Sequence, residues 1–171
     1  LDTLHDAFFL ANVKTVNLFL IGVGLIGGKL LELIQNQTQK LLDEYHLELK
    51  LTGISNSKKF LIDSNGISID DWKSRLLSEG DEADIDHFIE QMAGLNLSNS
   101  IFIDCTASDE IAASYDDVLQ SSISIVTANK KANSSSLAKY EELQRLAFRN
   151  NVAYLYETNV GAGLPVVATL K

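Results

Sequence analysis

The sequence has very little cysteine and no long apolar run. Cys105 is the only cysteine among the 171 residues. A lone cysteine cannot form an internal disulfide, which is typical of proteins from a reducing compartment such as the cytoplasm. No stretch approaches the ~18 apolar residues of a membrane-spanning helix, and no signal-peptide pattern opens the sequence. These absences argue against a secreted disulfide scaffold or a membrane protein, and they predict a cytoplasmic location.

Positive charge is also scarce. The sequence has 14 Lys and Arg residues against 23 Asp and Glu residues, a formal net charge of −9. An acidic surface repels nucleic-acid phosphates and anionic lipids, so we expect no nucleic-acid partner and no membrane partner. A site for an anionic cofactor would have to be built locally, from backbone N–H groups and a few lysines.

Segments that favour strands alternate with segments that favour helices. Short apolar runs predict buried strands over residues 16–21 and 100–104. Residues 47–54, 123–127 and 152–156 are also predicted to be strands. Apolar residues at helical spacing predict helices over residues 26–41, 70–78, 84–93, 109–120 and 137–148. The buried stripe of the first helix is expected to be Ile26, Leu30, Leu33, Ile34 and Leu41. Residues 55–70 are polar and are expected to form a loop.

This alternation predicts an α/β fold, a Rossmann-type doubly wound, mostly parallel sheet with helices on both faces. One domain is expected over residues 14–171, because this length suits a single globular unit. Residues 1–13 have apolar residues at helical spacing and are expected to be a linker or N-terminal helix from a preceding region. The sequence opens at Leu1, and its only methionine is Met92, so we expect a piece of a longer protein.

A glycine motif joins the first predicted strand to the first predicted helix. It reads Gly22-Val23-Gly24-Leu25-Ile26-Gly27. In dinucleotide-binding folds the first glycine permits the tight turn, the second lets a pyrophosphate approach the backbone, and the third lets the helix pack on the strand. The start of the helix also offers free N–H groups and partial positive charge to phosphates. This context favours an NAD(P) site over a glycine-rich turn without a ligand.

The second predicted strand ends without a carboxylate. NAD-binding domains usually place Asp or Glu there, on the ribose hydroxyls. This sequence has Ser55-Asn56-Ser57-Lys58-Lys59 instead. A carboxylate would repel a 2′-phosphate and a lysine would attract it. Ser55 and Lys58 are therefore candidate cofactor contacts, and NADP or dual use is favoured. The alternative is that the two lysines are ordinary solvated charges.

Two more polar segments follow predicted strands, where ligands bind in sheets of this kind. Thr106, Ala107 and Ser108 follow the third strand, and they either contact the cofactor or only cap the next helix. Lys130 and Lys131 follow the fourth strand. A lysine there could polarise a substrate carbonyl or move a proton; the alternative is surface charge.

The last segment contains Glu157 and a glycine-rich loop with the only proline, Pro165. Such a loop exposes backbone carbonyls beside one carboxylate, and hard cations prefer oxygen ligands. One carboxylate with neutral carbonyls favours a monovalent cation such as Na⁺. The alternative is a tight connection to another domain.

Together, the segments GVGLIGG, IDCTAS, VTANKKA and YETNVGAGLPVV resemble, in this order, the NAD(P)-binding domain of homoserine dehydrogenase. The opening residues and the segment SNSK resemble the bifunctional branch of that family, in which an aspartokinase and its regulatory domains precede the dehydrogenase. The resemblance implies reversible, NAD(P)H-dependent reduction of L-aspartate 4-semialdehyde to L-homoserine, a step toward threonine and methionine. It also implies a homo-oligomeric parent protein.

The resemblance assigns roles to matching residues. Gly22 to Gly27 would hold the pyrophosphate, Thr106 would contact the cofactor, and Lys130 would be catalytic, near nicotinamide and substrate. A structural sodium site of the family matches Glu157 with the backbone carbonyls of Val160, Ala162 and Leu164.

The resemblance does not reach the family's substrate domain, which carries an acidic substrate contact and a second lysine as proton donor. This chain alone is therefore expected to be inactive. One alternative is an NAD(P)-dependent dehydrogenase of another semialdehyde, but enzymes of the glyceraldehyde-phosphate type need a nucleophilic cysteine, and Cys105 ends a predicted buried strand. The other alternative is a non-catalytic nucleotide-binding module.

Overall fold

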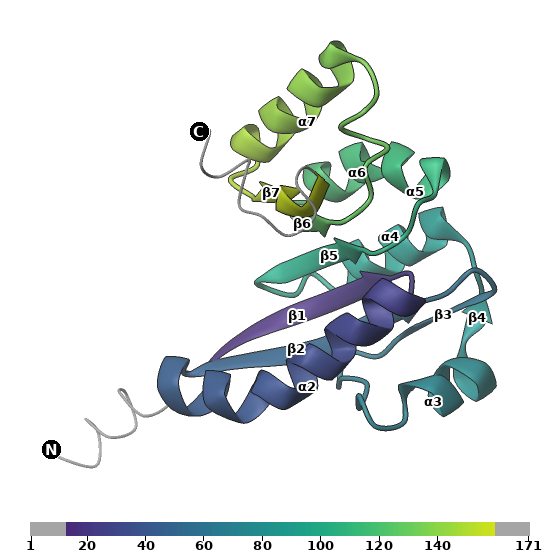
Figure 1. The fold of residues 1–171 in the computed structure, drawn as a ribbon, viewed down its shortest axis with the longest axis vertical. Helices are drawn as coiled ribbons and strands as arrows, with labels where there is room; N and C mark the ends of the chain where they lie inside the picture. The colour runs from purple at the N-terminus through teal and green to yellow at the C-terminus, as the bar shows by residue number, and fades with distance from the viewer. Residues whose placement is uncertain (1–12, 160–171) are drawn as a thin grey trace, which may run out of the picture.

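A sheet of seven strands runs through the protein, with helices on both of its faces (Figure 1). The structure, a computed structural model, describes residues 13–159. The strands are β1 (Lys14–Ile21), β2 (Leu47–Ser55), β3 (Lys59–Ile62), β4 (Asp81–Glu82), β5 (Ser100–Asp104), β6 (Ser124–Thr127) and β7 (Tyr154–Leu155). The helices are α2 (Leu25–Tyr45), α3 (Trp72–Glu79), α4 (Ile85–Gly94), α5 (Asp109–Ala113), α6 (Tyr115–Gln120) and α7 (Leu137–Arg149), followed by the 3-10 turn η1 (Glu157–Asn159).

The strand order is β4-β3-β2-β1-β5-β6-β7. Strands β2, β1, β5, β6 and β7 run parallel. Strands β3 and β4 form an antiparallel edge. The chain builds one half of the sheet outward from β1 and then returns to build the other half from β5. This reversal defines a doubly wound sheet and marks where its ligands bind, beyond the carboxyl ends of the strands. The predicted Rossmann-type fold is confirmed.

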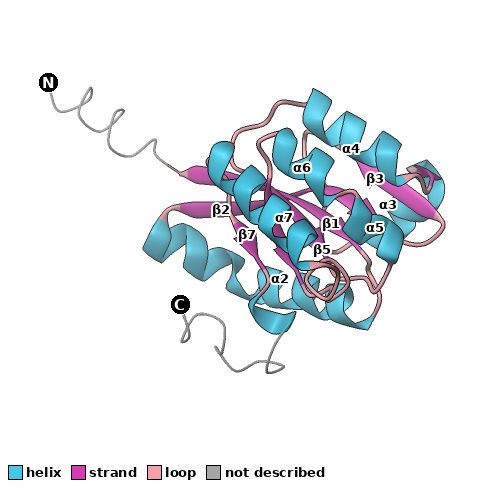
Figure 2. Ribbon diagram, turned by 90° about the horizontal axis from the view of Figure 1, so that it is seen from above, coloured by secondary structure: helices cyan, strands magenta, loops and turns pink. Residues whose placement is uncertain are grey.

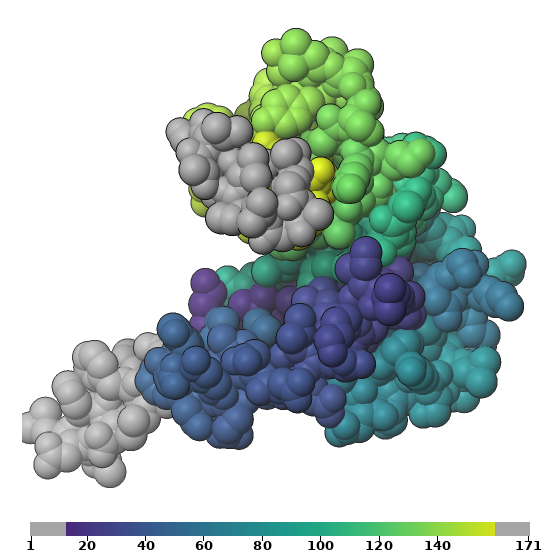
Figure 3. Space-filling view, in the orientation of Figure 1, coloured from purple at the N-terminus to yellow at the C-terminus, as the bar shows by residue number. Residues whose placement is uncertain are grey.

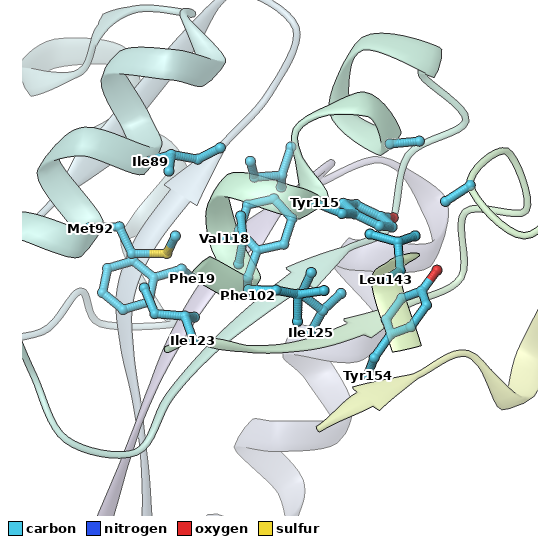
Figure 4. Close-up of a cluster of buried hydrophobic side chains, with 14 of the residues drawn as sticks. Phe19, Ile89, Met92, Phe102, Tyr115, Val118, Ile123, Ile125, Leu143 and Tyr154 are labelled. Atoms are coloured by element: carbon cyan, nitrogen blue, oxygen red, sulfur yellow. The ribbon is translucent and has the colours of Figure 1, made fainter. Parts of the chain in front are cut away.

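Each face of the sheet has its own hydrophobic core. Along β1, Leu18 points to one face and Phe19 to the other, because successive side chains of a strand alternate. Helices α2 and α3 cover the first face, and α4, α6 and α7 cover the second (Figure 2). Figure 4 shows the second core, where Phe19, Phe102 and Tyr115 lie among aliphatic side chains. Because these strands run parallel, their carboxyl ends lie at one edge of the sheet.

The polar segment after β2 contains a strand. The predicted loop over residues 55–70 was wrong, because β3 pairs there with β2 in the antiparallel direction. Asn56 closes the turn between them: its Oδ1 accepts hydrogen bonds from the backbone N–H groups of Lys58 (2.7 Å) and Lys59 (2.8 Å). Phe60 is buried in this short strand. A four-residue strand has too few apolar positions to show a period of two.

The helix expected over residues 109–120 is divided into α5 and α6. The two meet at Ser114, whose hydroxyl donates a hydrogen bond back to the carbonyl oxygen of Ile111 (2.9 Å). Serine hydroxyls compete in this way with the helical backbone. After the break, α6 begins with Tyr115, which is fully buried against the sheet.

The stripe expected on α2 was wrong in part. Leu31 and Ile34 face the core, whereas Ile26 is 56% exposed and Leu33 is 51% exposed. The buried residue of the first turn is Gly27, whose missing side chain lets the helix approach the end of β1. In the space-filling view, the first turn of α2, in purple to blue, lies at the surface (Figure 3).

Candidate functional site

The carboxyl ends of β1, β2 and β5 surround a cavity of about 1050 Å³. It lies where the strand order reverses, the usual ligand position in such sheets. The turns after these strands, residues of α3 and the start of α4 form its wall. Of the predicted cofactor contacts, this wall contains Gly22, Val23, Gly24, Ser55, Lys58, Thr106, Ala107 and Ser108. The structure therefore brings together residues from three separate segments of the sequence.

Three glycines shape the turn between β1 and α2. Gly22 has a φ of +89°, and a Cβ there would lie 2.7 Å from Cγ2 of Thr106. A Cβ on Gly27 would overlap the carbonyl oxygen of Gly22. Gly24 differs, because a Cβ there would meet no atom within 4 Å. The turn is therefore closely packed at two glycines and open at the one where a pyrophosphate must approach.

The start of α2 suits an anion. Its N-cap, Gly24, provides no side-chain hydrogen bond, and its first turn has no acidic residue. The first N–H groups of a helix have no partner within the helix, and they carry partial positive charge. Leu25 and Ile26 direct their side chains toward solvent, at 92% and 56% exposure. These two predicted contacts can thus take part only through their backbone, which is what a phosphate needs.

The two lysines after β2 differ in their surroundings. Lys59 donates from Nζ to the carbonyl oxygens of Leu77 (2.8 Å) and Gly80 (2.9 Å), at the end of α3. Lys58 is exposed. Both lysines line the cavity, and Lys73 in the first turn of α3 lines it too. Sequence reasoning missed Lys73, because its place depends on the β3 hairpin that carries the chain back toward β2.

A buried polar network lies beneath the segment that follows β5. Asp104 is fully buried. Its Oδ2 accepts hydrogen bonds from the Tyr115 hydroxyl (2.7 Å) and Asn129 Nδ2 (2.9 Å), and its Oδ1 accepts one from the Thr106 backbone N–H (2.7 Å). Thr127 Oγ1 lies 2.6 Å from the Tyr115 hydroxyl. The network ties the segment after β5 to the segment after β6, and sequence reasoning did not find it.

Ser108 is the N-cap of α5. Its Oγ accepts a hydrogen bond from the backbone N–H of Ile111 (3.4 Å), and its own N–H donates to Thr106 Oγ1 (3.2 Å). The capping role is therefore confirmed for Ser108. Both hydroxyl residues also line the cavity, and their contact with a cofactor stays a prediction.

Lys130 and Lys131 lie beside the cavity and are not part of its wall. The preceding Asn129 is buried, and its Nδ2 donates to the carbonyl oxygen of Ser108 (2.8 Å), a cavity residue. Lys131 forms an ion pair with Asp109 at 3.1 Å. Lys130 is exposed and forms no ion pair within the described part of the chain. The two neighbouring lysines are thus distinct: one ammonium is paired and the other is available.

The Glu157 turn is held on the segment after β6. Thr158 Oγ1 donates to the carbonyl oxygen of Thr127 (3.5 Å), and Asn159 Nδ2 donates to that of Asn129 (3.2 Å). The other predicted cation ligands lie outside the described residues: Val160, Ala162 and Leu164. Within residues 13–159, no group of three or more His, Cys, Asp or Glu side chains could hold a metal ion.

Cys105 lines the cavity, and its thiol is kept protonated. Burial, and then the charge of Asp104, raise the pKa of Cys105 to about 11. The thiolate is the reactive form, so we expect iodoacetamide to label Cys105 slowly at neutral pH and faster as the pH rises toward that pKa. Saturating NADPH should slow the labelling at every pH, because the thiol lies in the cavity wall. Peptide mass spectrometry measures both effects, and rapid labelling at neutral pH that NADPH leaves unchanged would contradict them.

The open glycine turn, the uncapped helix start and the position of the cavity define a dinucleotide-binding domain of the Rossmann class. Residues 22–157 match the family model described as homoserine dehydrogenase, NAD binding domain. The chain belongs to this family.

Curated relatives include bifunctional proteins. The chain is 40% identical over 172 residues to bifunctional aspartokinase/homoserine dehydrogenase 2, chloroplastic, of Arabidopsis thaliana, a match that covers 100% of the chain and 19% of the relative. It is 38% identical over 167 residues to bifunctional aspartokinase/homoserine dehydrogenase of Haemophilus influenzae, covering 98% of the chain and 20% of the relative. The chain thus spans about a fifth of the length of these relatives.

A solved structure shares the fold. A hyperthermophilic archaeal homoserine dehydrogenase in complex with NADPH superposes with a TM-score of 0.72 at 23% identity, over 92% of this chain and 48% of the other. Among the described residues, no helix combines the length and the apolar character needed to cross a membrane.

Proposed function

We propose that the whole protein is an NAD(P)-dependent homoserine dehydrogenase, which interconverts L-aspartate 4-semialdehyde and L-homoserine by hydride transfer in threonine and methionine biosynthesis. The observation that carries this proposal is the match of residues 22–157 to the family of that enzyme's cofactor domain. The bifunctional relatives support an additional aspartate kinase activity in the same protein.

The proposal is tested with the full-length protein, L-homoserine and NADP⁺, by following the absorbance of NADPH. Turnover of homoserine is the expected result. Turnover of a different amino or hydroxy alcohol, with none of homoserine, would replace the substrate assignment. Tight NADPH binding without turnover of any alcohol would favour the nucleotide-binding module instead.

Residues 14–171 act in this proposal as the cofactor-binding domain, and residues 1–13 connect it to a preceding regulatory region. The substrate domain would come from the remainder of the protein, since the chain spans only 19% of its Arabidopsis relative. The isolated chain should then bind cofactor without oxidising homoserine. A homo-oligomeric parent protein and a cytoplasmic location belong to the proposal, and the lone cysteine supports the location.

A sodium ion is also proposed, bound by Glu157 and by the carbonyl oxygens of Val160, Ala162 and Leu164. The oxygen-rich, singly charged donor set supports a hard monovalent cation. The ion would hold the Glu157 turn next to the segment that carries Lys130, since Asn159 already bonds to the Asn129 carbonyl.

The residues present fit a dinucleotide, because the only open glycine of the turn faces free space at an uncapped helix start. The cofactor supplies a hydride donor or acceptor when bound. The first N–H groups of α2 would bind its pyrophosphate, and Thr106 would contact it at the end of β5. Lys130 would place its ammonium at the carbonyl oxygen of the semialdehyde and stabilise the negative charge that develops as the alkoxide forms.

The end of β2 favours NADP over NAD. Lys58 and Lys73 line the cavity there, without a carboxylate on the turn. Replacing both lysines by Glu should weaken NADPH binding by at least about tenfold, since hydrogen bonds to charged groups contribute ~1.5–3 kcal/mol. NADH binding should change much less, because NADH lacks the 2′-phosphate. Titration by NAD(P)H fluorescence measures both affinities.

The control for this pair is Lys40→Glu. Lys40 is exposed on α2, outside the cavity wall, and it faces Glu44 at 4.0 Å. It changes the net charge without touching the site, so both affinities should stay near those of the wild type. Equal weakening of NADPH and NADH by the double variant would refute the 2′-phosphate assignment.

A further inference from the structure

The segment that carries Lys130 is anchored by side chains that are almost inaccessible to solvent. Asp104 and Tyr115 are 0% exposed, Asn129 is 1% exposed and Thr127 is 2% exposed. A buried carboxylate needs compensation, and Asp104 forms no ion pair within the described residues. Its compensation comes from hydrogen-bond donors.

The donors to Asp104 come from two different segments. The Thr106 backbone N–H, 2.7 Å from Oδ1, belongs to the segment that lines the cavity. Asn129 Nδ2, 2.9 Å from Oδ2, belongs to the segment that carries Lys130. Charge-assisted hydrogen bonds of this kind are stronger and shorter than neutral ones. The carboxylate therefore joins the two segments at the crevice.

Asn129 forms hydrogen bonds through its side-chain nitrogen, its side-chain oxygen and its backbone carbonyl. Besides Asp104, its Nδ2 donates to the carbonyl oxygen of Ser108 (2.8 Å). Its Oδ1 accepts from the backbone N–H of Lys131 (3.1 Å), and its carbonyl oxygen accepts from Asn159 Nδ2 (3.2 Å). The residues on both sides of Lys130 are therefore anchored. Asn129 is anchored by its own side chain, and Lys131 is anchored by its backbone N–H, which donates to that side chain.

We propose that Asn129, held by Asp104, is a positioning residue that fixes Lys130 relative to the cofactor-lining segment. This inference rests on the proposed function for its assignment of Lys130. The exposed lysine side chain has no ion pair of its own to direct it, so its place is set by the backbone that Asn129 anchors. Cofactor bound against Thr106 and Ser108 would thus lie at a fixed distance from the backbone of Lys130, from which its ammonium extends.

The main test compares Asn129→Ala with Tyr154→Phe in the full-length protein. Asn129→Ala removes the contacts to Asp104, Ser108 and Lys131. Tyr154→Phe also removes a partly buried hydrogen bond to the same loop, from its hydroxyl to Asn133 Oδ1 (3.0 Å), but leaves Asn129 in place. We expect Asn129→Ala to lower kcat by about 10- to 100-fold, as misplacement by ~1 Å does, with little change in the Kd for NADPH. Tyr154→Phe should lower the Tm without this loss of kcat.

A second readout does not depend on turnover. Acetylation of Lys130 by an N-hydroxysuccinimide ester is followed by mass spectrometry, with and without saturating NADPH. NADPH should protect Lys130 in the wild type and in Tyr154→Phe, and protection should be lost in Asn129→Ala although NADPH still binds. Lys139, paired with Asp116 at 2.6 Å, is the internal reference.

The outcomes separate the two proposals. If NADPH protects Lys130 in the wild type but the protein turns over no homoserine, the proposed function is refuted. The positioning role is then judged by the labelling result alone. Unchanged kcat and unchanged protection in Asn129→Ala would overturn the positioning role, as would equal effects of Tyr154→Phe. If Asn129→Ala does not fold, Asn129→Ser gives the same comparison, because a serine hydroxyl is too short to reach both Asp104 and Ser108.

Discussion

Replacing Lys130 by alanine in the full-length protein is expected to lower kcat for homoserine by about 10²- to 10⁴-fold, the usual contribution of a positioned acid or base. The fold should survive, because Lys130 is exposed and takes part in no ion pair within the described residues. Its loss removes the ammonium that would stabilise the developing alkoxide. Steady-state kinetics and the Tm, measured together, check this expectation.

Lys131→Ala is the matched control. Lys131 is the next residue in the same loop, but its Nζ is paired with Asp109 at 3.1 Å, and the two side chains are 47% and 80% exposed. Exposed pairs contribute ~0–1 kcal/mol to stability, so the Tm should hardly change, and kcat should stay near that of the wild type. An unaffected Lys130→Ala protein, or a greater loss in Lys131→Ala, would show that the catalytic lysine has been misassigned.

The parallel part of the fold could be predicted from the sequence because its strands are mainly apolar segments that alternate with helical patterns. The antiparallel edge could not. Strands β3 and β4 have four and two residues, and the turn before β3 depends on hydrogen bonds that one side chain, Asn56, accepts from the backbone. Such a contact has no periodic signature.

The candidate site divides in the same way. Gly22, Gly24 and Gly27 could be found from spacing, because a tight turn, an approaching pyrophosphate and a closely packed helix require glycine at these three positions of one short segment. Lys73 and Asn129 could not, because their positions follow from tertiary structure: α3 returns across the hairpin, and the segment after β6 folds over a buried carboxylate. The sequence shows that Asn129 is polar and follows a strand, but it does not show that this side chain is buried.

Gly24→Val should abolish most cofactor binding while leaving the domain folded. A side chain at Gly24 meets no protein atom within 4 Å, so no overlap opposes folding. The residue has φ −75° and ψ −146°, and this ψ lies outside the regions that β-branched residues usually adopt, so a modest fall in the Tm is expected. The valine methyls would instead occupy the space that a pyrophosphate must enter. Losing two hydrogen bonds to a charged group, at ~1.5–3 kcal/mol each, corresponds to at least about 100-fold weaker NADPH binding.

Valine at two other glycines tests whether the effect at Gly24 comes from lost ligand binding or from disturbed packing. Gly28→Val also meets no atom within 4 Å, but it lies one turn further along α2 and outside the wall of the main cavity, so NADPH binding should be kept. Gly27→Val would overlap the Gly22 carbonyl, so it should lower the Tm strongly whether or not NADPH is present. Fluorescence titration and thermal unfolding of the three variants therefore separate a ligand contact from a packing requirement within one short motif. NADPH affinity in Gly24→Val equal to that in Gly28→Val would place the pyrophosphate elsewhere.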